Sequence, residues 1–520
     1  MKKILCLILA VAMLLGMTAC GKPQEEAAPA AASLSVGYYA VDISPTESLP
    51  LDGYAGTQWE PATRWSNGVD WPLYAIAIAI TDANGETVMI VALDMLLAFM
   101  ADAMRQAIEG ATGVPKENIF FHCTHNHNGV ALRINEPPVV NYTVALTENV
   151  QLAAKEAMND RKTVTEFSTT FARAEDIATV RHYLTSDGEY MSSNKSEREE
   201  GVTWYGHTTV ADNMIQLAKF TREGGKDVLL MNYQGHLCAS GISLKLATSD
   251  YAGVMRNYVE TELDCLSMFI QGGGGNLGMG TQLKDEVLRA DSRDYKHLGR
   301  TLGADAVAVA DTFQPIVIDN IQHKEQMTFV DTRDGGKQKV FLNAFTIGEF
   351  ALVSAPFEIF DTNAMYVREN SPYKMTFYSS CTNGSNQYLA TSECFDWRYS
   401  YEAFGSIGAK GAAEAVQDEL LGMLNTLYGT DKAPIAKPEG YIRGEYEPET
   451  NGVTYTIWKY EDGSVMKPVK NDFQQFYGIN ENGDPKVLLV KDTALAEQIA
   501  GMESAKFLFD HQNVIVGIAE

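Results

Sequence analysis

The chain has 520 residues, of which 45% are hydrophobic, and a formal net charge of −26. This length allows one large domain and one small domain, and the hydrophobic content is ordinary for a globular protein. The strong negative charge, without a Lys- or Arg-rich stripe anywhere in the sequence, excludes nucleic acid and other polyanions as partners.

Residues 1–20 have the features of a lipoprotein signal peptide. Lys2 and Lys3 precede an apolar run that is too short to span a membrane, and a Thr-Ala pair leads into Cys20. We expect export, cleavage before Cys20 and a lipid on its sulfur that anchors the protein to the cell membrane, facing outward. A plain signal peptide, with Cys20 a bystander, is the alternative. Residues 21–35 are rich in Ala, Pro, Glu and Gln and predict a disordered tether.

The segments that follow alternate between strand and helix patterns. Asn84-Gly85 lies between two β-rich runs and supplies the positive φ angles of a tight antiparallel hairpin. The predicted strands are 73–81, 88–93, 118–123, 228–233, 266–270, 350–354 and 375–380. The predicted helices are 100–110, 147–158, 251–262, 295–312 and 407–427. This mixture predicts an α/β fold class, with a mixed β-sheet core and flanking helices, over residues 36–430.

The end of the chain differs from this pattern in composition. Residues 431–440 contain two prolines and read as a linker. Residues 441–520 are rich in aromatic and turn residues and predict a small C-terminal module of β or α+β type.

Four side chains that can bind zinc lie at or after the ends of predicted strands. They are His125, His236, Glu358 and Tyr388. Zinc is held by imidazole nitrogen and carboxylate oxygen, and α/β folds place their chemistry at the carboxyl ends of strands. Taken singly, each histidine also fits a structural role, and the glutamate also fits a surface or capping role.

A series of short motifs strengthens the case for a shared site. These are Asp42-Ile43-Ser44-Pro45, Gly53-Tyr54, Asp70-Trp71-Pro72-Leu73-Tyr74-Ala75, Thr124-His125-Asn126-His127-Asn128-Gly129, Asn232-Tyr233-Gln234-Gly235-His236, Ser249-Asp250-Tyr251-Ala252-Gly253, Pro356-Phe357-Glu358, and Asn383-Gly384 with Tyr388 and Tyr401-Glu402. In this order, over residues 34–430, they resemble the catalytic domain of the neutral ceramidases. The resemblance implies a bound Zn²⁺ with His125, His236, Glu358 and Tyr388 as ligands. It does not extend to residues 441–520, where ceramidases carry a larger immunoglobulin-like domain.

One segment departs from the family pattern at a position that matters for chemistry. Ceramidases have Gly-Asp-Val-Ser-Pro-Asn, whose serine is needed for amide cleavage, where this chain has Gly275-Asn276-Leu277-Gly278-Met279-Gly280. Gly278 therefore stands at the serine position. The resemblance thus implies a divergent member that lacks the family's serine.

A route without serine is chemically sufficient, because zinc lowers the pKa of bound water from about 15.7 to about 7 and polarises a carbonyl oxygen. We expect such water to cleave an amide, or less readily an ester, of a lipid or small N-acyl substrate. His127 is a candidate proton shuttle or a structural residue. Tyr388 is a candidate for stabilising an oxyanion as well as a ligand. Arg181 matches the family's substrate-binding arginine, with a surface salt bridge as the alternative.

Two further features leave alternatives open. The run Gly272 to Gly275 allows close backbone approach and suits a wall of the site that presents N–H groups. Cys123 and Cys238 are predicted to be buried and unpaired, with a bridge or a thiolate ligand as the alternative. Besides a zinc hydrolase, the sequence permits a catalytically inactive surface binding lipoprotein with the same fold, or a purely structural zinc.

Overall fold

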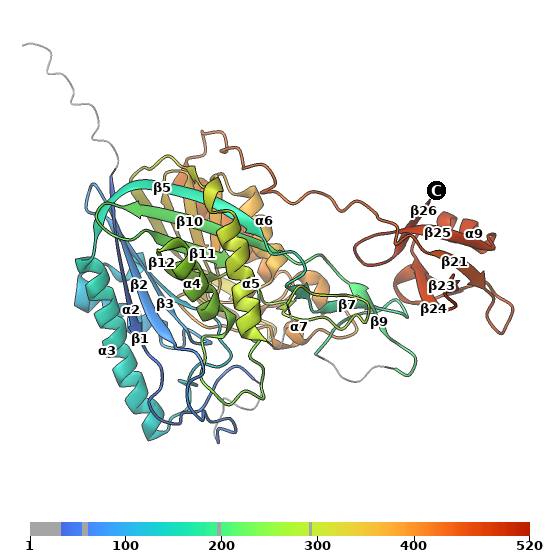
Figure 1. The fold of residues 1–520 in the computed structure, drawn as a ribbon, viewed down its shortest axis with the longest axis horizontal. Coiled ribbons are helices and arrows are strands. Elements are labelled where there is room, and N and C mark those ends of the chain that lie inside the picture. Colours follow the sequence, from blue (N-terminus) through green and yellow to red (C-terminus); the bar gives the residue numbers. More distant parts are fainter. Residues whose placement is uncertain (1–32, 55–60, 195–198, 291–293, 520) are drawn as a thin grey trace, which may run out of the picture. The chain divides into compact units, whose positions relative to one another are not determined.

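The computed structural model describes residues 33–54, 61–194, 199–290 and 294–519. The predicted signal peptide, Cys20 and most of the predicted tether lie outside these residues. Within them, none of the helices combines the length and the apolar character that crossing a bilayer requires. The fold is α/β with mixed sheets and flanking helices, as predicted (Figure 1).

The largest sheet has nine strands, with β14 paired to β5 beside the order β12-β11-β10-β5-β1-β2-β3-β4. Its strands are β1 (Leu34–Asp42), β2 (Tyr74–Asp82), β3 (Thr87–Leu93), β4 (Ile119–Cys123), β5 (Lys162–Arg173), β10 (Met214–Arg222), β11 (Val228–Tyr233), β12 (Leu266–Gln271) and β14 (Gln314–Pro315). The pairs β3–β4 and β11–β12 are parallel, and the other pairs are antiparallel. The hairpin predicted at Asn84-Gly85 joins β2 to β3.

A second sheet of four strands packs against the first. Its order is β15-β16-β17-β19, with β17 and β19 parallel. These strands are β15 (Ile321–Asp331), β16 (Lys337–Ile347), β17 (Phe350–Ser354) and β19 (Met375–Ser379). Smaller pairings join β6 (Thr179–Val180) to β13 (Leu277–Gly278), β18 (Glu358–Ile359) to β20 (Tyr388–Leu389), and β7 (His182–Thr185) to β8 (Tyr190–Ser192) and β9 (Trp204–His207).

Most predicted elements are confirmed to within a few residues, but two helix starts are wrong. The helices are α2 (Ala101–Thr112), α3 (Pro137–Asn159), α4 (Asp250–Leu263), α5 (Tyr295–Ala308), α6 (Asp361–Asn370), α7 (Tyr401–Gly405), α8 (Ala412–Tyr428) and α9 (Thr493–Ala500), with 3-10 turns at Lys116–Asn118, Ala310–Thr312, Ser392–Phe395 and Lys470–Asp472. Helix α3 begins at Pro137, well before 147, because proline is tolerated in a first helical turn. Helix α8 begins only after Gly411, whose φ of 93° is left-handed.

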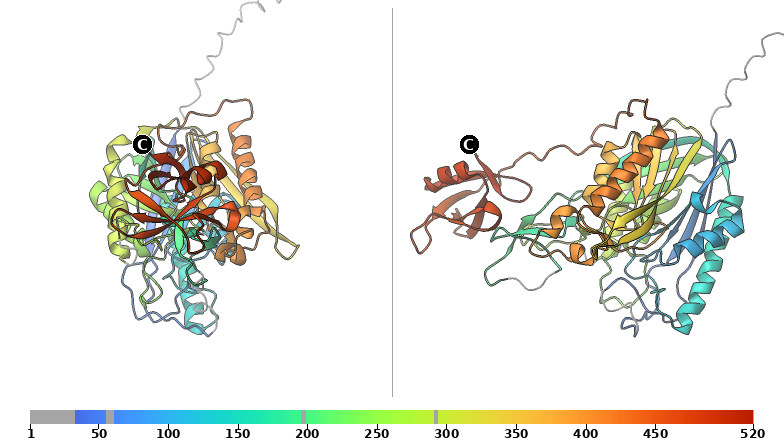
Figure 2. Two further views of the ribbon diagram at one scale, coloured as in Figure 1. Left: turned by 90° about the vertical axis from the view of Figure 1, so that its right-hand side faces the viewer. Right: turned by 180° about the vertical axis from the view of Figure 1, so that it is seen from behind.

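Alternate side chains of β2 show how the layers form. Ile76 and Ile78 pack with Phe345 and Phe350 of the second sheet. The alanines between them, such as Ala77, pack under helices α2 and α3 on the other face. Helices α4 and α5 cover the rest of that face, and α6 and α8 cover the outer face of the second sheet (Figures 1 and 2). Because successive side chains of a strand point to opposite faces of the sheet, each buried strand contributes to two hydrophobic cores.

The C-terminal module contains six strands and α9. Its strands are β21 (Thr454–Trp458), β22 (Met466–Pro468), β23 (Gln474–Asn480), β24 (Pro485–Val490), β25 (Ser504–Phe509) and β26 (Ile515–Ala519). Because β21 pairs with both β25 and β23, the sheet closes on itself like a small barrel. This agrees with the predicted β or α+β module. Tyr441, the first residue of the predicted module, is instead buried in the core between the two large sheets.

Candidate metal centre

Three histidines meet where β4 and β11 end. His125 and His127 follow β4, and His236 follows β11. The ring centroids are 4.7 Å apart for His125 and His236, 4.8 Å for His127 and His236, and 5.2 Å for His125 and His127. Their candidate ligand nitrogens all lie within 4.8 Å of one another. These three side chains form a group that could hold a metal ion.

The backbone at His125 explains why His127 joins this group. The strand ends at Cys123, and His125 takes a φ of 64°, in the left-handed region. A non-glycine residue there costs about 1–2 kcal/mol, so neighbouring contacts must hold the turn. Asn126 supplies them, because its side-chain amide donates to the carbonyl oxygens of Asp94 and Thr248. The turn brings both histidines to the same side, whereas a continued strand would separate them.

Backbone carbonyls orient two of the imidazole rings. His236 Nδ1 lies 3.1 Å from the Gly274 oxygen, and His125 Nδ1 lies 3.1 Å from the Leu96 oxygen. An Nδ1–H that donates to a carbonyl leaves Nε2 to carry the lone pair. Histidines that bind metals are usually held in this way. Both Nε2 atoms point toward the middle of the cluster.

Glu358 brings a carboxylate to the same place. Its Oε2 lies 3.2 Å from His125 Nε2. Burial would raise the pKa of Glu358, but the charge and hydrogen bond of His125 lower it to about 2. Burial would lower the pKa of His125, but Glu358 and then Cys381 raise it well above its usual value. Without a metal, the structure therefore favours a buried ion pair between the two.

Several buried nitrogen and oxygen atoms in the cluster have too few hydrogen-bond partners within the protein, and a bound cation would satisfy them. Apart from their ion pair, His125 Nε2 and Glu358 Oε2 have no hydrogen-bond partner. His127 Nε2 and His236 Nε2 face each other at 2.9 Å, and only one proton fits between them. Burial, followed by the charge on His125, lowers the pKa of His127 and of His236 well below the usual value, so both rings are neutral. Two neutral imidazoles beside a third histidine and a carboxylate, all directed at one point, are the chemistry of a transition-metal site.

Tyr388 lies beside this cluster. The short parallel pair β18–β20 sets Tyr388 opposite Glu358. Its hydroxyl oxygen accepts a hydrogen bond of 3.1 Å from the Arg181 guanidinium. Burial, and then the Glu358 carboxylate, raise the pKa of Tyr388 well above its usual value. The phenol is therefore neutral, and its own proton is free to be donated.

The Arg181 side chain is only 12% exposed and pairs with a fully buried carboxylate, so its ion pair is not an ordinary surface salt bridge. Its Nε donates to Glu402 Oε1 at 2.6 Å, and an Nη donates to the Gly275 oxygen at 2.6 Å. The other oxygen of Glu402 lies 2.8 Å from His182 Nε2. Burial would raise the pKa of Glu402, but His182 and Arg181 lower it to about 2. A carboxylate that is ionised at neutral pH thus fixes the guanidinium beside Tyr388.

The glycine run allows the close backbone approach that was predicted, but two of its amides are used within the fold. The amides of Gly272 and Gly275 donate to the oxygens of Tyr233 and Ile359, so they do not face a ligand. A Cβ on Gly274 would lie 2.1 Å from the Gln234 oxygen, and one on Gly275 would lie 2.7 Å from the Glu358 oxygen. The run therefore lets the loops of His236 and Glu358 pack together.

Gly278 has room for a Cβ atom. A Cβ there would lie 3.7 Å from the Gly280 oxygen and 3.8 Å from Arg181 Cβ, which are ordinary contacts. Its strand β13 pairs with β6, immediately before Arg181. A small side chain at Gly278 would fit without displacing its neighbours.

Three contacts of the cluster were not anticipated from sequence. Tyr54 packs edge-on against His127, with ring centroids 5.1 Å apart. A Cβ on Gly53 would lie 2.5 Å from the His127 Cα, which explains the Gly-Tyr motif. Cys381 Sγ lies 3.5 Å from His125 Nδ1. Cys123 and Cys238 are free thiols, so the structure has no bridge at either of them.

Comparisons with known proteins place the fold. No protein-family model matches the chain, and no curated protein matches it. Solved structures do match it, and two of them are ceramidases. One is described as ceramidase complexed with C2, with a TM-score of 0.61, 14% identity and coverage of 88% of this chain and 89% of the other. The second is neutral ceramidase from Pseudomonas aeruginosa, with a TM-score of 0.60, 14% identity and coverage of 86% and 84%. The chain therefore has a ceramidase-like fold.

Proposed function

We propose that this protein is an exported, zinc-dependent hydrolase that cleaves the amide bond of an N-acyl lipid or small molecule. The observation that carries the proposal is the meeting of His125, His127, His236 and Glu358 at one point, with buried lone pairs directed inward. The likeness of the fold to ceramidases supports the same class of reaction. An anchor on Cys20 would hold the enzyme at the outer face of the cell membrane, close to lipid substrates.

His125, His236 and Glu358 would hold the zinc, with His127 either completing the ligand set or carrying a proton. Zinc supplies Lewis acidity, which polarises a carbonyl group and makes water acidic enough to attack it at neutral pH. Arg181 donates a hydrogen bond to the Tyr388 hydroxyl, whose own proton would stabilise the negative oxygen that forms during amide cleavage. No step in this scheme needs a side chain at Gly278.

The proposal is tested by turnover on a panel of N-acyl substrates, with metal content measured on the same samples. We expect hydrolysis by the zinc-loaded protein, loss of hydrolysis with a chelator, and recovery on adding Zn²⁺. The variant His236→Ala should lose both metal and activity. His323→Ala is the matched control, since His323 also pairs with a carboxylate, that of Glu86 at 3.0 Å, and should keep both.

A surface binding protein is the second candidate, and the glycine at position 278 favours it. In that case the protein would bind N-acyl molecules and zinc without cleaving them. Zinc-loaded protein that retains an N-acyl ligand unchanged through prolonged incubation would support binding alone and would rule out the hydrolase.

A further inference from the structure

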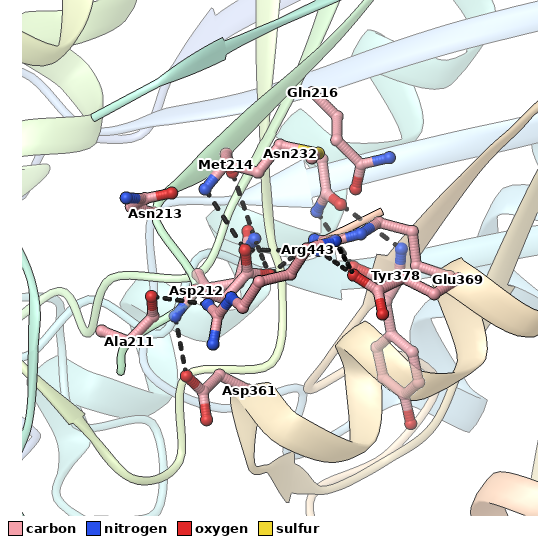
Figure 3. A network of polar contacts seen from close by, with 12 residues as sticks. Ala211, Asp212, Asn213, Met214, Gln216, Asn232, Asp361, Glu369, Tyr378 and Arg443 are labelled. Carbon is pink, nitrogen blue, oxygen red and sulfur yellow. Dashed lines mark hydrogen bonds and ion pairs between the residues drawn. The ribbon is translucent and has the colours of Figure 1, made fainter. Parts of the chain in front are cut away.

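A buried polar network adjoins the loops that carry the metal cluster. At its centre is Asp212, whose carboxylate accepts hydrogen bonds from Arg368 and from the side chain of Gln234. Its backbone N–H donates to Asp361 Oδ2 at 2.9 Å. Figure 3 shows Asp212 and Asp361 facing each other in this way, with Arg443 alongside. Both carboxylates are fully buried.

Asp361 is also bonded reciprocally to Asn276. The Asn276 amide donates to Asp361 Oδ1 at 2.7 Å, and the Asp361 backbone N–H donates to Asn276 Oδ1 at 2.9 Å. Asn276 directly follows Gly275, and Asp361 begins helix α6 just after Glu358 and Ile359. The pair therefore ties the glycine loop to the loop that carries Glu358.

The same network reaches His236 by two routes. Gln234, two residues before His236, donates to Asp212. The glycine loop supplies the Gly274 oxygen that lies 3.1 Å from His236 Nδ1. A shift of either loop would rotate an imidazole or move a carboxylate relative to the other ligands. Contacts behind metal ligands of this kind commonly change metal affinity about 10- to 100-fold when they are removed.

We propose that the Asn276–Asp361 pair positions His236 and Glu358 for metal binding. This inference rests on the proposed metal site but not on turnover. The reciprocal bonds give the amide and the carboxylate defined orientations, so the two groups can be exchanged. The exchange would keep every bond. An amide placed at position 361 would donate to a carboxylate placed at position 276, and its oxygen would accept from the Asp212 N–H.

The test uses the full chain with Asn276→Asp, Asp361→Asn and the double exchange. Each single change puts two donors or two acceptors in contact, so we expect Zn²⁺ affinity to fall about 10- to 100-fold. The visible spectrum of the Co²⁺-loaded protein should change with it, because that spectrum reports ligand geometry. The double exchange should restore both affinity and spectrum. Affinity is measured by competition with a chromophoric chelator, and circular dichroism checks folding.

Asn118→Asp is the matched control. Asn118 is as buried as Asn276 and also donates to a carboxylate, that of Glu86, but it lies at the opposite end of β4 from His125. It should lower stability without altering the Co²⁺ spectrum.

The inference would be overturned if the single variants fold and bind Zn²⁺ as tightly as wild type. It would also be overturned if the double variant folds but recovers neither the Zn²⁺ affinity nor the Co²⁺ spectrum. Wild-type protein that binds no metal overturns it together with the proposed function. Wild-type protein that binds metal but cleaves nothing contradicts only the function.

Discussion

The two sides of the candidate site are built very differently. On one side, His125, His127, His236 and Glu358 are packed so closely that glycines are needed where their loops meet. On the other side, the strand with Gly278 leaves room for a side chain that is not there. The two sides therefore differ in how much substitution they allow. The loops of the histidines and Glu358 have no room for a Cβ at Gly274 or Gly275, whereas position 278 has room for a small side chain.

The largest expected effect is on Zn²⁺ affinity and comes from removing the negative charge of Glu358. Glu358→Gln keeps the shape of the side chain but removes the carboxylate that pairs with His125. We expect Zn²⁺ affinity to fall by more than about 100-fold, since losing a ligand should exceed the loss of its supporting contacts. Equilibrium dialysis with metal analysis measures the change. Retention of full affinity would show that the carboxylate is no ligand.

A second prediction distinguishes the metal ligands from Tyr388, which lies beside them. Tyr388→Phe removes a hydroxyl that Arg181 holds, and we expect kcat to fall about 100-fold. Zinc content should remain near wild type, because the imidazoles and Glu358 are untouched. Tyr401→Phe is the control, since its ring lies 5.8 Å from that of Tyr388. Zinc lost together with activity would instead make Tyr388 a ligand.

The space at Gly278 is tested by substituting a small side chain there. Gly278→Ser places a hydroxyl beside Arg181, and we expect kcat for amide substrates to rise about tenfold, less than the roughly 100- to 10,000-fold of a fully positioned proton-transfer group. Gly278→Ala occupies the same space without the hydroxyl and should leave kcat near wild type. Equal rates for all three proteins would mean that this position does not face the substrate.

The smallest effect concerns acid stability. Because the pKa of Glu402 is held at about 2, below its usual 4.5, its contribution to folding is complete above pH 4.5 and is lost as pH falls through 2. As pH falls from 4.5 to 2, the free energy of unfolding of the wild type should decrease more steeply than that of Glu402→Gln. The difference should be about 1.4 kcal/mol per pH unit. Urea unfolding at several pH values measures both slopes. Parallel slopes would contradict the buried, ionised state of Glu402.

The α/β class and seven of the strands were predictable because those strands are apolar and bounded by clear turns. The hairpin at Asn84-Gly85 and the strand 228–233 are examples that the structure confirms. The long strands β1, β5, β10, β15 and β16 were not predicted. The start of α3 was missed because Pro137 and Pro138 hide a helical first turn from a search for helical spacing. The place of Tyr441 was missed because its burial depends on two sheets formed far earlier in the chain.

The candidate site was predictable only in part. Strand ends and the family resemblance brought attention to His125, His236 and Glu358, which the structure brings together. The position of His127 depends on a left-handed backbone at His125, which no local pattern announces. The network of Asp212, Asp361 and Asn276 is formed by residues far apart in sequence, and only tertiary packing shows that they meet. The roles of all these residues remain predictions.

The close packing at residues 272–275 limits which positions of the candidate site can be engineered. A library that randomises 272–275 would yield mostly misassembled sites, because even a methyl group there strikes a neighbouring loop. Position 278 has room for a small side chain beside Arg181. It is therefore the better place to begin altering the side of the site where we propose that the substrate binds.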